Sequence, residues 1–476
     1  MNVLDTVTVV VAGLGVSGSA TAEVARACGA RIIALDTRSD VVDRVRREDP
    51  RLDARLVDHA SQAREIYADA DVIVISPGIA PHEPLYVEAT LAAAPLVSEI
   101  EFAWQLEGKL GRRRDWLCVT GTNGKTTTVG MCASILDAAG IKSRACGNVG
   151  TPVVRAITEA DTSALVVELS SFQLHTTSSV SPLASVCLNV ASDHLDWHGD
   201  EASYRADKAR VYEHTRRACL YPVGDATVTR MVEDADVVEG ARAVGLTLGI
   251  PGPSQLGCVE DLLLDRAFIA DRRRSAQQIA TFGDLAHLGG AIPAAPIVAD
   301  ALAAAGLARA GGVSAEAVSE GLRSFVPAAH RRSVVSQATG VTWIDDSKAT
   351  NSHAARASLT GMEPRSVVWI AGGDAKGQVF DDLVASVKDT LRGVVLIGRD
   401  RAPLREALRR GAPDVAVVEL EDHPEIMTSA VNEAVALSIP GNSVILAPAC
   451  ASWDQFANYS ARGEAFREAI EGLERA

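Results

Sequence analysis

The stretch Val119-Thr-Gly-Thr-Asn-Gly-Lys-Thr-Thr-Thr128 constrains this chain more than any other part of its sequence. It follows an apolar run, residues 116–119, that is typical of a buried strand, and it precedes residues 129–139, whose apolar side chains recur with helical spacing. A glycine-containing turn between a strand and a helix directs backbone N–H groups and the positive end of the helix dipole towards one point, which favours phosphate. Within this turn Lys125 can reach terminal phosphates, and the Thr126 hydroxyl can ligate Mg²⁺.

The turn is a shortened variant of the phosphate-binding loop. The strict pattern requires a glycine five positions before Gly124, and Val119 stands there. The alternative is a threonine-rich turn that only caps a helix. We prefer a phosphate site because Gly-Lys-Thr between a strand and a helix is typical of one.

The composition narrows the class of protein. The 476 residues predict about three domains, and 47% hydrophobic with 22% charged residues is typical of a globular protein with large cores. A formal net charge of −15 argues against nucleic acid as a partner, since phosphate backbones need clustered lysine and arginine. A nucleotide needs only local positive charge.

The cysteines and the apolar runs indicate a compartment. The eight cysteines are scattered and include no Cys-x-x-Cys pair, which favours free thiols in a reducing cytosol over disulfides or a metal cluster. The N-terminus has no basic region or cleavable signal, and no apolar run reaches about 18 residues. We therefore expect a cytoplasmic protein without a membrane span.

The N-terminal part has a Rossmann-type pattern. A strand at residues 7–13 ends in Gly13-Leu-Gly-Val-Ser-Gly18, a helix follows, and a strand at residues 31–35 ends at Asp36. Taken alone this pattern predicts NAD, although the same turn accepts any diphosphate. A third strand ends in Ser76-Pro-Gly78, so the three strand ends should line one pocket. For Ser76-Pro-Gly78, the alternative is a simple turn.

Two metal-ligand candidates follow strands of the central part. Glu168 lies near the end of a strand at residues 164–170, and His194 follows a strand at residues 184–190. A carboxylate and an imidazole beside a triphosphate are natural Mg²⁺ ligands. Taken singly, the first could be a surface carboxylate and the second a structural histidine. An unmodified lysine would be repelled by Mg²⁺, so the pattern assigns Lys208 to the solvated face of an amphipathic helix.

The remaining segments complete the organisation. Residues 220–288 contain short strand-like pieces, which we interpret as a peripheral part of the central domain, and residues 291–310 form an alanine-rich helical segment. Beyond residues 327–332 the α/β pattern resumes, and its apolar runs lead into polar segments that mark a ligand edge. These segments are Asp345-Asp-Ser-Lys-Ala-Thr-Asn351, Gly372-Gly-Asp-Ala-Lys376 and Pro448-Ala-Cys-Ala-Ser-Trp453.

We therefore predict an α/β protein of three domains. Residues 1–105 form an N-terminal Rossmann-like domain, residues 106–328 a central P-loop ATPase-type domain with a parallel sheet, and residues 329–476 a C-terminal Rossmann-like domain. Polar strand ends in all three domains indicate one cleft where the domains meet.

With these motifs in order, the chain resembles the Mur ligases, ATP-dependent amide ligases of peptidoglycan precursor synthesis. The resemblance covers all three domains, and Asp36-Thr-Arg38, Ser76-Pro-Gly78 and the C-terminal segments narrow it to the members that add D-glutamate. Further segments that carry it are Thr120-Gly-Thr-Asn-Gly-Lys-Thr-Thr127, Gly147-Asn-Val-Gly150, Glu168-Leu-Ser-Ser-Phe-Gln-Leu174, residues 189–194, Tyr204-Arg-Ala-Asp-Lys208 and Ala447-Pro-Ala-Cys-Ala-Ser-Trp-Asp-Gln-Phe456.

The resemblance implies a cytoplasmic, monomeric enzyme that joins D-glutamate to UDP-N-acetylmuramoyl-L-alanine with ATP and two Mg²⁺ ions. Phosphoryl transfer to the L-alanyl carboxylate would give an acyl phosphate, which the amine of D-glutamate attacks. Closure of the third domain over the second would exclude water meanwhile.

The same resemblance assigns the site residues. The catalytic residues are Lys125, Glu168, His194 and Lys208. The ATP-binding residues are Gly121, Thr122, Asn123, Gly124, Lys125, Thr126, Thr127, Asp300, Arg331 and Asp346. The UDP moiety contacts Val16, Ser17, Asp36, Thr37, Arg38, Ser76 and Gly78, and Asn148, Ser170 and Gln173 lie near the substrate. D-Glutamate contacts Lys348, Thr350, Lys376, Ser452 and Trp453, with Tyr459 nearby.

The metal ligands so implied are Thr126, Glu168, His194 and Lys208, the last if it is carbamylated. A carbamate replaces the ammonium by a carboxylate, which removes the electrostatic objection to Lys208. The chain departs from the family before the alanine-rich helix, where many members have asparagines that approach adenine. Asp300 can keep one polar contact there, whereas Ile297 cannot.

Three other readings stay open. One is another Mur ligase or a folylpolyglutamate synthetase. Another is an NAD-dependent oxidoreductase built on the first domain, which leaves the phosphate-binding loop without a purpose. The third is a nucleotide-gated binding module, which predicts no ADP release that depends on D-glutamate.

Overall fold

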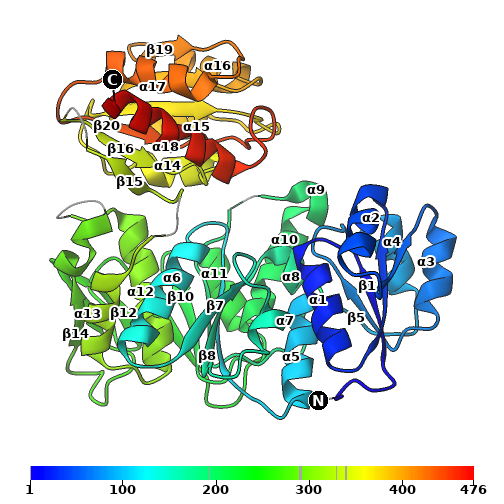
Figure 1. The fold of residues 1–476 in the computed structure, drawn as a ribbon. Coiled ribbons are helices and arrows are strands. Elements are labelled where there is room, and N and C mark those ends of the chain that lie inside the picture. Colours follow the sequence, from blue (N-terminus) through cyan, green and yellow to red (C-terminus); the bar gives the residue numbers. More distant parts are fainter. Residues whose placement is uncertain (1, 192, 289–291, 328–329, 338–339, 476) are drawn as a thin grey trace. The chain divides into compact units, whose positions relative to one another are not determined.

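The computed structural model describes residues 2–191, 193–288, 292–327, 330–337 and 340–475. The chain forms two compact units, each a layered α/β structure (Figure 1). The first contains Met1–His287 and Val298–Phe325, and the second contains Leu288–Ile297 and Val326–Ala476. The described residues form three sheets. The predicted α/β fold class is confirmed.

The first sheet has five parallel strands in the order β3-β2-β1-β4-β5. They are β1 (Thr8–Ala12), β2 (Arg31–Asp36), β3 (Asp53–Leu56), β4 (Val72–Ile75) and β5 (Leu96–Val97). The helices of this part are α1 (Val16–Ala27), α2 (Ser39–Glu48), α3 (Ala60–Tyr67) and α4 (Pro84–Thr90). The strand order reverses at β1, so the ends of β1 and β4 flank the crevice where such sheets bind ligands.

The second sheet has nine strands in the order β14-β13-β12-β11-β10-β9-β6-β8-β7. They are β6 (Asp115–Thr120), β7 (Ser143–Gly147), β8 (Ala164–Glu168), β9 (Ala184–Cys187), β10 (Ala218–Pro222), β11 (Arg242–Leu246), β12 (Gln255–Val259), β13 (Leu262–Asp265) and β14 (Gln277–Thr281). The strands are parallel except at the β12–β13 and β13–β14 pairs. Residues 220–288, expected to be peripheral, therefore extend this sheet.

Nine helices and two 3₁₀ segments accompany the second sheet within the described residues. They are α5 (Glu99–Lys109), α6 (Lys125–Ala138), α7 (Val153–Ala156), α8 (Ser171–Leu174), α9 (Leu195–His198), α10 (Glu201–Ala209), η1 (Arg210–Tyr212), α11 (Ala226–Glu233), η2 (Phe282–Leu288), α12 (Ala295–Ala310) and α13 (Ala315–Ser324). Asp200 caps the start of α10 by accepting a hydrogen bond from Ser203 N.

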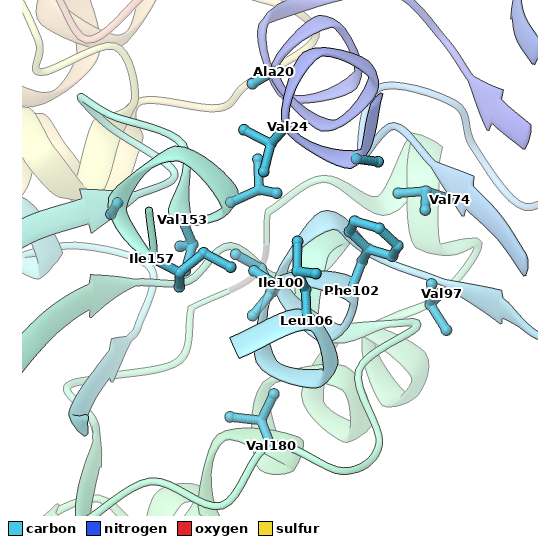
Figure 2. Packing of buried hydrophobic residues seen from close by; sticks show 14 of the residues in the cluster. Ala20, Val24, Val74, Val97, Ile100, Phe102, Leu106, Val153, Ile157 and Val180 are labelled. Carbon is cyan, nitrogen blue, oxygen red and sulfur yellow. The ribbon is translucent and has the colours of Figure 1, made fainter. Parts of the chain in front are cut away.

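Helix α5 joins the first two sheets into one unit. Figure 2 shows Ile100, Phe102 and Leu106 of α5 near Val24 of α1 and near Ile157, which directly follows α7. All five belong to one buried apolar cluster, which also includes strand residues of both sheets. Fully burying an apolar side chain of this size stabilises the fold by roughly 1.5–3 kcal/mol. This shared core explains why the two sheets belong to one compact unit.

The second unit has six strands in the order β15-β16-β20-β17-β18-β19, parallel except at β15–β16. They are β15 (Ser333–Ser336), β16 (Thr342–Asp345), β17 (Val367–Gly372), β18 (Leu391–Ile397), β19 (Ala416–Glu419) and β20 (Ser443–Leu446). Its helices are α14 (Ser352–Leu359), α15 (Asp381–Val387), α16 (Ala402–Gly411), α17 (Ile426–Leu437) and α18 (Tyr459–Arg475).

Strand β17 illustrates why the central strands of this sheet have continuous apolar sequences. Trp369 packs in the cluster on one face, and Val368 and Ile370 pack in the cluster on the other. Successive side chains of a strand point to opposite faces, so a strand covered on both sides has no polar alternation.

The sequence led us to expect two domain boundaries and no membrane span. The boundary after residue 105 lies within α5, and the one after residue 328 falls on residues 328–329, outside the described part of the chain. No helix among the described residues is long and apolar enough to cross a membrane.

Candidate active site

The phosphate-binding loop connects β6 to α6. Gly121 and Gly124 have φ angles of 149° and 86°, a range that favours glycine. Gly124 is the N-cap of α6, so the helix begins at Lys125, earlier than residue 129 where helical spacing was expected to begin. Lys125, Thr126 and the following residue therefore occupy the first turn, whose backbone N–H groups lack partners within the helix.

The loop after β9 holds the phosphate-binding loop in shape. The side-chain amide of Asn189 brackets Asn123, accepting from its N at 2.9 Å and donating to its O at 3.2 Å. Asn189 O accepts from Thr122 N at 3.0 Å. The Thr122 and Tyr204 hydroxyl oxygens are 2.9 Å apart. The sequence analysis named Asn189 only within a segment that carries the resemblance and gave it no role, although its place after a strand beside β6 could have indicated one.

Glu168, Thr126 and Asn148 lie together at neighbouring strand ends. Thr126 Oγ1 donates to Glu168 Oε2 at 2.5 Å, and Asn148 Nδ2 donates to Glu168 Oε1 at 3.0 Å. Glu168 is only 2% exposed, which excludes a surface carboxylate. A buried carboxylate beside a hydroxyl offers two hard oxygen ligands, which fits Mg²⁺.

The described side chains do not by themselves form a complete metal-binding site here. Within the described residues, no group of three or more His, Cys, Asp or Glu side chains is placed to hold a metal ion. Mg²⁺ is usually held by one or two carboxylates together with substrate phosphates and water. The Thr126–Glu168 pair suits that mode of binding.

Two lysines converge on one carbonyl oxygen of the loop. Lys125 Nζ donates to Gly121 O at 2.7 Å, and Lys208 Nζ donates to the same oxygen at 2.9 Å. Lys208 is buried, with Nζ 4.8 Å from the centre of the Tyr204 ring. Burial, and then the charge of Lys125, lowers the pKa of Lys208 to about 7. The prediction of a solvated face for Lys208 is wrong, because periodicity alone does not tell what packs against each face of α10.

His194 is the N-cap of α9, with a φ of 54°. Its ring packs edge-on against Phe172, with centroids 4.8 Å apart. Partial burial of the His194 ring, whose side chain is 49% exposed, lowers its pKa; Asp193 opposes this effect, and the charges of Lys125 and Lys208 reinforce it. Neutral imidazole is the form that ligates metals, so His194 fits a ligand role.

A polar network beside Lys208 was not indicated by the sequence. Asp207 Oδ2 lies 2.8 Å from His175 Nδ1 and 3.0 Å from His198 Nδ1, and His198 Nε2 lies 2.9 Å from Ser171 Oγ. Burial raises the pKa of Asp207, but hydrogen bonds to the two histidines outweigh burial and hold that pKa below its usual range. The network fastens α8, α9 and α10 around the buried lysine.

Ser170 and Gln173, expected near the substrate, bond to each other. Gln173 Oε1 accepts from Ser170 N and from Ser170 Oγ, each at 3.0 Å, and Ser170 Oγ accepts from Gln173 N at 3.2 Å. This is a capping box at the start of α8, two residues after Glu168. A substrate contact for either residue stays a prediction.

Asp300 packs against the phosphate-binding loop. Its Oδ1 accepts from Thr128 Oγ1 at 3.2 Å, and a Cβ placed on Gly124 would lie 2.4 Å from the same oxygen. Asp300 is 8% exposed, and Thr127 in the adjoining turn is partly buried. The predicted contact between Asp300 and adenine is not tested by this geometry.

The N-terminal motifs meet at the ends of β1, β2 and β4. Asp36 Oδ2 accepts from Leu14 N at 2.8 Å, and the Arg38 guanidinium pairs with Asp36 Oδ1 at 3.0 Å. A Cβ on Gly13 would lie 2.6 Å from Ser76 Cβ. Burial raises the pKa of Asp36, but hydrogen bonds from Arg38 and Leu14 outweigh it and keep that pKa low. The other residues of this predicted pocket are exposed or partly exposed: Val16, Ser17, Thr37 and Gly78.

In the second unit, the loops after β16, β17 and β20 are joined by backbone hydrogen bonds. Asp374 and Ala451 exchange N–H···O bonds of 2.9 and 3.0 Å, and Ala449 N donates to Ala349 O at 2.8 Å. These three strands are neighbours in the order β16-β20-β17, so their carboxyl ends lie at one edge. The C-terminal segments singled out in the sequence therefore lie together.

Arg462 of α18 connects two of these loops through buried hydrogen bonds. It is 1% exposed, and it donates to Ser347 O at 2.9 Å, to Ser347 Oγ at 3.0 Å and to Cys450 O at 3.2 Å. Sequence reasoning did not identify Arg462, because a lone arginine on a surface-type helix gives no signal of burial.

The predicted D-glutamate residues occupy this edge. Lys348 Nζ lies 3.8 Å from the centre of the Tyr459 ring. Trp453 is 72% exposed beside buried Ser452. The exposed Lys376 has a φ of 48° and donates its N–H to Asp374 Oδ1 at 3.1 Å, and Thr350 N donates to Lys348 O at 2.8 Å.

Asp346, the residue after β16, lies close to the arginines that precede β15. Asp346 N donates to Leu446 O at 2.9 Å, and Asp346 Oδ1 accepts from Arg332 N at 3.2 Å. Burial raises the pKa of Asp346 to about 6, while Arg331 and Arg332 act to lower it. Next to Arg331, the buried His330 places Nδ1 2.6 Å from Asp345 Oδ2.

Three family models match the chain. They are the MurD-like N-terminal domain of Mur ligases at residues 7–98, the Mur ligase middle domain at residues 119–242 and the glutamate ligase domain of Mur ligases at residues 330–450. Together they cover the parts of the chain that hold the N-terminal pocket, the phosphate-binding loop and the C-terminal loops as far as residue 450.

Curated relatives match over nearly the whole chain. A UDP-N-acetylmuramoylalanine–D-glutamate ligase of Streptomyces coelicolor is 50% identical over 98% of both chains. A protein of the same name from Rhodococcus jostii is 43% identical over 98% of this chain and 95% of its own.

Solved structures share the fold at lower identity. The UDP-N-acetylmuramate–alanine ligase MurC of Thermotoga maritima has a TM-score of 0.57 at 18% identity, covering 98% of this chain and 99% of that one. MurF of Acinetobacter baumannii has a TM-score of 0.55 at 15% identity, covering 94% and 86%.

Proposed function

Because this chain belongs to the Mur ligase family, we propose that it joins D-glutamate to UDP-N-acetylmuramoyl-L-alanine with ATP, as an amide ligase of peptidoglycan precursor synthesis. The observation that carries the proposal is 50% identity, over 98% of both chains, to a relative named for this reaction. The geometry supports it, since Lys125 and Thr126 belong to one phosphate-binding loop, which Glu168 and Lys208 contact.

The first unit activates the carboxylate. The L-alanyl carboxylate oxygen attacks the terminal phosphorus of ATP, the bond to the bridging oxygen breaks, and ADP leaves, so that an acyl phosphate forms. Lys125 and the first-turn N–H groups of α6 offset the charge on the transferring phosphoryl oxygens. We place the UDP moiety at Asp36, Arg38 and Ser76, whose strand ends adjoin Gly13.

Two groups of side chains are assigned to Mg²⁺. Thr126 and Glu168 would hold one ion, and His194 with carbamylated Lys208 would hold a second. When bound, Mg²⁺ supplies charge neutralisation at the phosphate oxygens. A pKa lowered to about 7 makes the neutral amine, the form that adds to CO₂, accessible at neutral pH. The carbamate then replaces a repelled cation by an anionic ligand.

The second unit supplies the amine. We assign the carboxylates of D-glutamate to Lys348, Lys376 and the Ser452 hydroxyl, with Thr350 and Trp453 beside them, and we assign Arg331 and Asp346 to the nucleotide. The free amine attacks the acyl carbon, the tetrahedral intermediate collapses, and inorganic phosphate leaves with the oxygen that came from the substrate carboxylate. We further propose that the enzyme acts as a monomer in the cytoplasm, where ATP is available.

The test is an assay of the purified chain with UDP-N-acetylmuramoyl-L-alanine, ATP and Mg²⁺. Phosphate release and a product heavier by one glutamyl residue should appear with D-glutamate and not with L-glutamate or meso-diaminopimelate. With an ¹⁸O-labelled substrate carboxylate, one labelled oxygen should appear in the released phosphate. Phosphate free of label, or equal turnover with another amino acid, would disprove the proposal.

A further inference from the structure

The amino ends of β10 and β11 border a basic cavity of about 320 Å³. Arg217 directly precedes β10, Arg242 is the first residue of β11, Arg309 lies in the last turn of α12, and residues 267–272 follow β13. We call this cavity the arginine pocket. The phosphate-binding loop follows the carboxyl end of β6, and β6, β9, β10 and β11 run parallel. The pocket therefore lies at the opposite edge of the sheet from the candidate active site.

The lining of the pocket is strongly cationic. It contains the side chains of Arg217, Arg242, Arg272 and Arg309, and no acidic side chain of the described residues lines it. The chain as a whole has a formal net charge of −15. The charge of this cluster is therefore opposite in sign to the net charge of the chain. Because like charges repel when they are close together, the four arginines also repel one another.

One carboxylate behind the pocket compensates only one of the four arginines. Asp265, at the end of β13, is fully buried and pairs with Arg309 at 2.9 Å. The other oxygen of Asp265 accepts from Ala267 N at 2.7 Å and from Phe268 N at 2.9 Å, which shapes the loop over the cavity. Asp265 thus shapes the wall of the pocket, and its carboxylate forms an ion pair with a single guanidinium, that of Arg309.

The other three guanidiniums have no carboxylate partner among the described residues within ion-pair distance. Arg242 is held in place by neutral contacts: it donates to Ala267 O at 3.0 Å and stacks 5.4 Å from the centre of the Phe268 ring. Burial lowers the pKa of Arg242, and the charges of Arg272 and Arg217 lower it further, with Asp265 opposing. All three side chains line the same cavity.

We propose that the arginine pocket binds a small molecule that carries a phosphate or diphosphate group. Three uncompensated guanidiniums require an anion of more than one charge for neutralisation, and their planar forks match phosphate oxygens two at a time. The volume lies at the lower end of the range for small-molecule sites and exceeds that of a single phosphate. This binding is separate from the ATP proposed at Lys125.

The test uses inorganic pyrophosphate as the probe and the full chain with Lys125→Ala, which weakens binding at the phosphate-binding loop. Calorimetry at constant ionic strength should show one further site. Adding Arg217→Ala and Arg272→Ala should raise its Kd at least about 10-fold, because two charge-assisted contacts are lost. The matched control Arg47→Ala, an exposed arginine of α2, should leave the Kd unchanged.

Two outcomes would overturn the proposal. One is a double alanine variant that binds pyrophosphate as tightly as its parent. The other is equal competition by a tetraglutamate peptide, which would assign the pocket to acidic peptides instead. Neither replaced side chain makes a hydrogen bond or an ion pair with another described residue, so both variants should fold, and thermal melting checks this. If the alanine variant does not fold, Arg217→Lys with Arg272→Lys keeps the charge but loses both forks; here too, an unchanged Kd contradicts the proposal.

Discussion

Single buried side chains in this molecule are driven towards neutrality or held charged by the donors around them. Burial raises the pKa of Glu99 to about 7 and lowers that of Lys208 to about 7. Asp36 is also buried, yet Arg38 and Leu14 donate to it and keep its pKa low. Each shift therefore depends on whether enough donors or opposite charges compensate the loss of water.

Glu99→Gln should stabilise the protein above neutral pH. Between the unfolded pKa near 4.5 and the folded pKa of about 7, native Glu99 keeps a proton that the unfolded chain has lost, so stability falls as pH rises through this window. Glutamine does not titrate. We expect equal stability near pH 5 within about 1 kcal/mol, and a gain of roughly 1–3 kcal/mol at pH 8.

Urea unfolding at both pH values measures the Glu99 effect. The control is Glu101→Gln on the same helix, whose carboxylate accepts from Ser178 N and Ser179 N at 2.9 Å each. That change should lower stability at pH 8. A difference between Glu99→Gln and the parent that does not vary with pH would contradict the expectation.

At the scale of elements, helix starts and strand ends decide where chemistry can occur. Helix α6 begins at the left-handed Gly124, against Asp300 of α12, and so presents its first turn to a phosphate. Helix α18 brings Arg462 under two loops of the second unit. In both cases one residue at a helix sets the shape of a loop that follows a strand.

Gly124→Ala should disrupt nucleotide binding as well as stability. Its φ of 86° strains any other residue, and the added Cβ would lie 2.4 Å from Asp300 Oδ1. We expect a loss of about 1–3 kcal/mol in unfolding free energy and an ATP Kd raised at least about 10-fold. Gly140→Ala, beyond the other end of α6, has a φ of 71° and open space around its Cβ. It should cost stability alone, and equal effects of the two changes on ATP binding would refute this account.

Arg462→Ala should loosen the amino-acid edge of the second unit. Loss of buried hydrogen bonds from a charged donor should cost about 3 kcal/mol. Because the loops at Ser347 and Cys450 lose their common anchor, KM for D-glutamate should rise while KM for ATP stays within about two-fold. Arg475→Ala, an exposed arginine on the same helix, is the control. An unchanged KM for D-glutamate would show that Arg462 serves stability only.

At the scale of the molecule, the two compact units divide the proposed reaction. The first contains the phosphate-binding loop with Lys125, and the second contains the loop with Lys348. Activation of the carboxylate and capture by the amine are thus assigned to different units of one chain. This division predicts that substitutions in the two units stop the reaction at different steps.

Hydroxylamine can separate the steps, because it traps an acyl phosphate as a hydroxamate without D-glutamate. Lys125→Ala should reduce the trapped hydroxamate about 100-fold or more. Lys348→Ala should leave it within about three-fold and still lose amide formation. Lys142→Ala and Lys388→Ala, exposed lysines of the first and second unit, are the controls. Loss of hydroxamate in Lys348→Ala would mean that the units do not divide the reaction in this way.

The sequence by itself determined the α/β class, the loop at residues 119–128 and the polar strand ends, because these depend on periodicity and on residues close together along the chain. Asp36, Glu168 and the C-terminal segments could be placed at ligand edges for that reason. Helix α6 was expected four residues too late, since helical apolar spacing does not include the polar first turn.

Only the tertiary structure decided which polar groups lose water and what compensates them. Lys208 and the Gly121 carbonyl it contacts are 87 positions apart, and Arg462 is 115 positions from Ser347. Asp207 meets His175 across 32 positions. Burial and pairing are properties of surfaces brought together by folding, so no local pattern records them. The arginine pocket arises in the same way, from four segments whose charges meet only in the folded sheet.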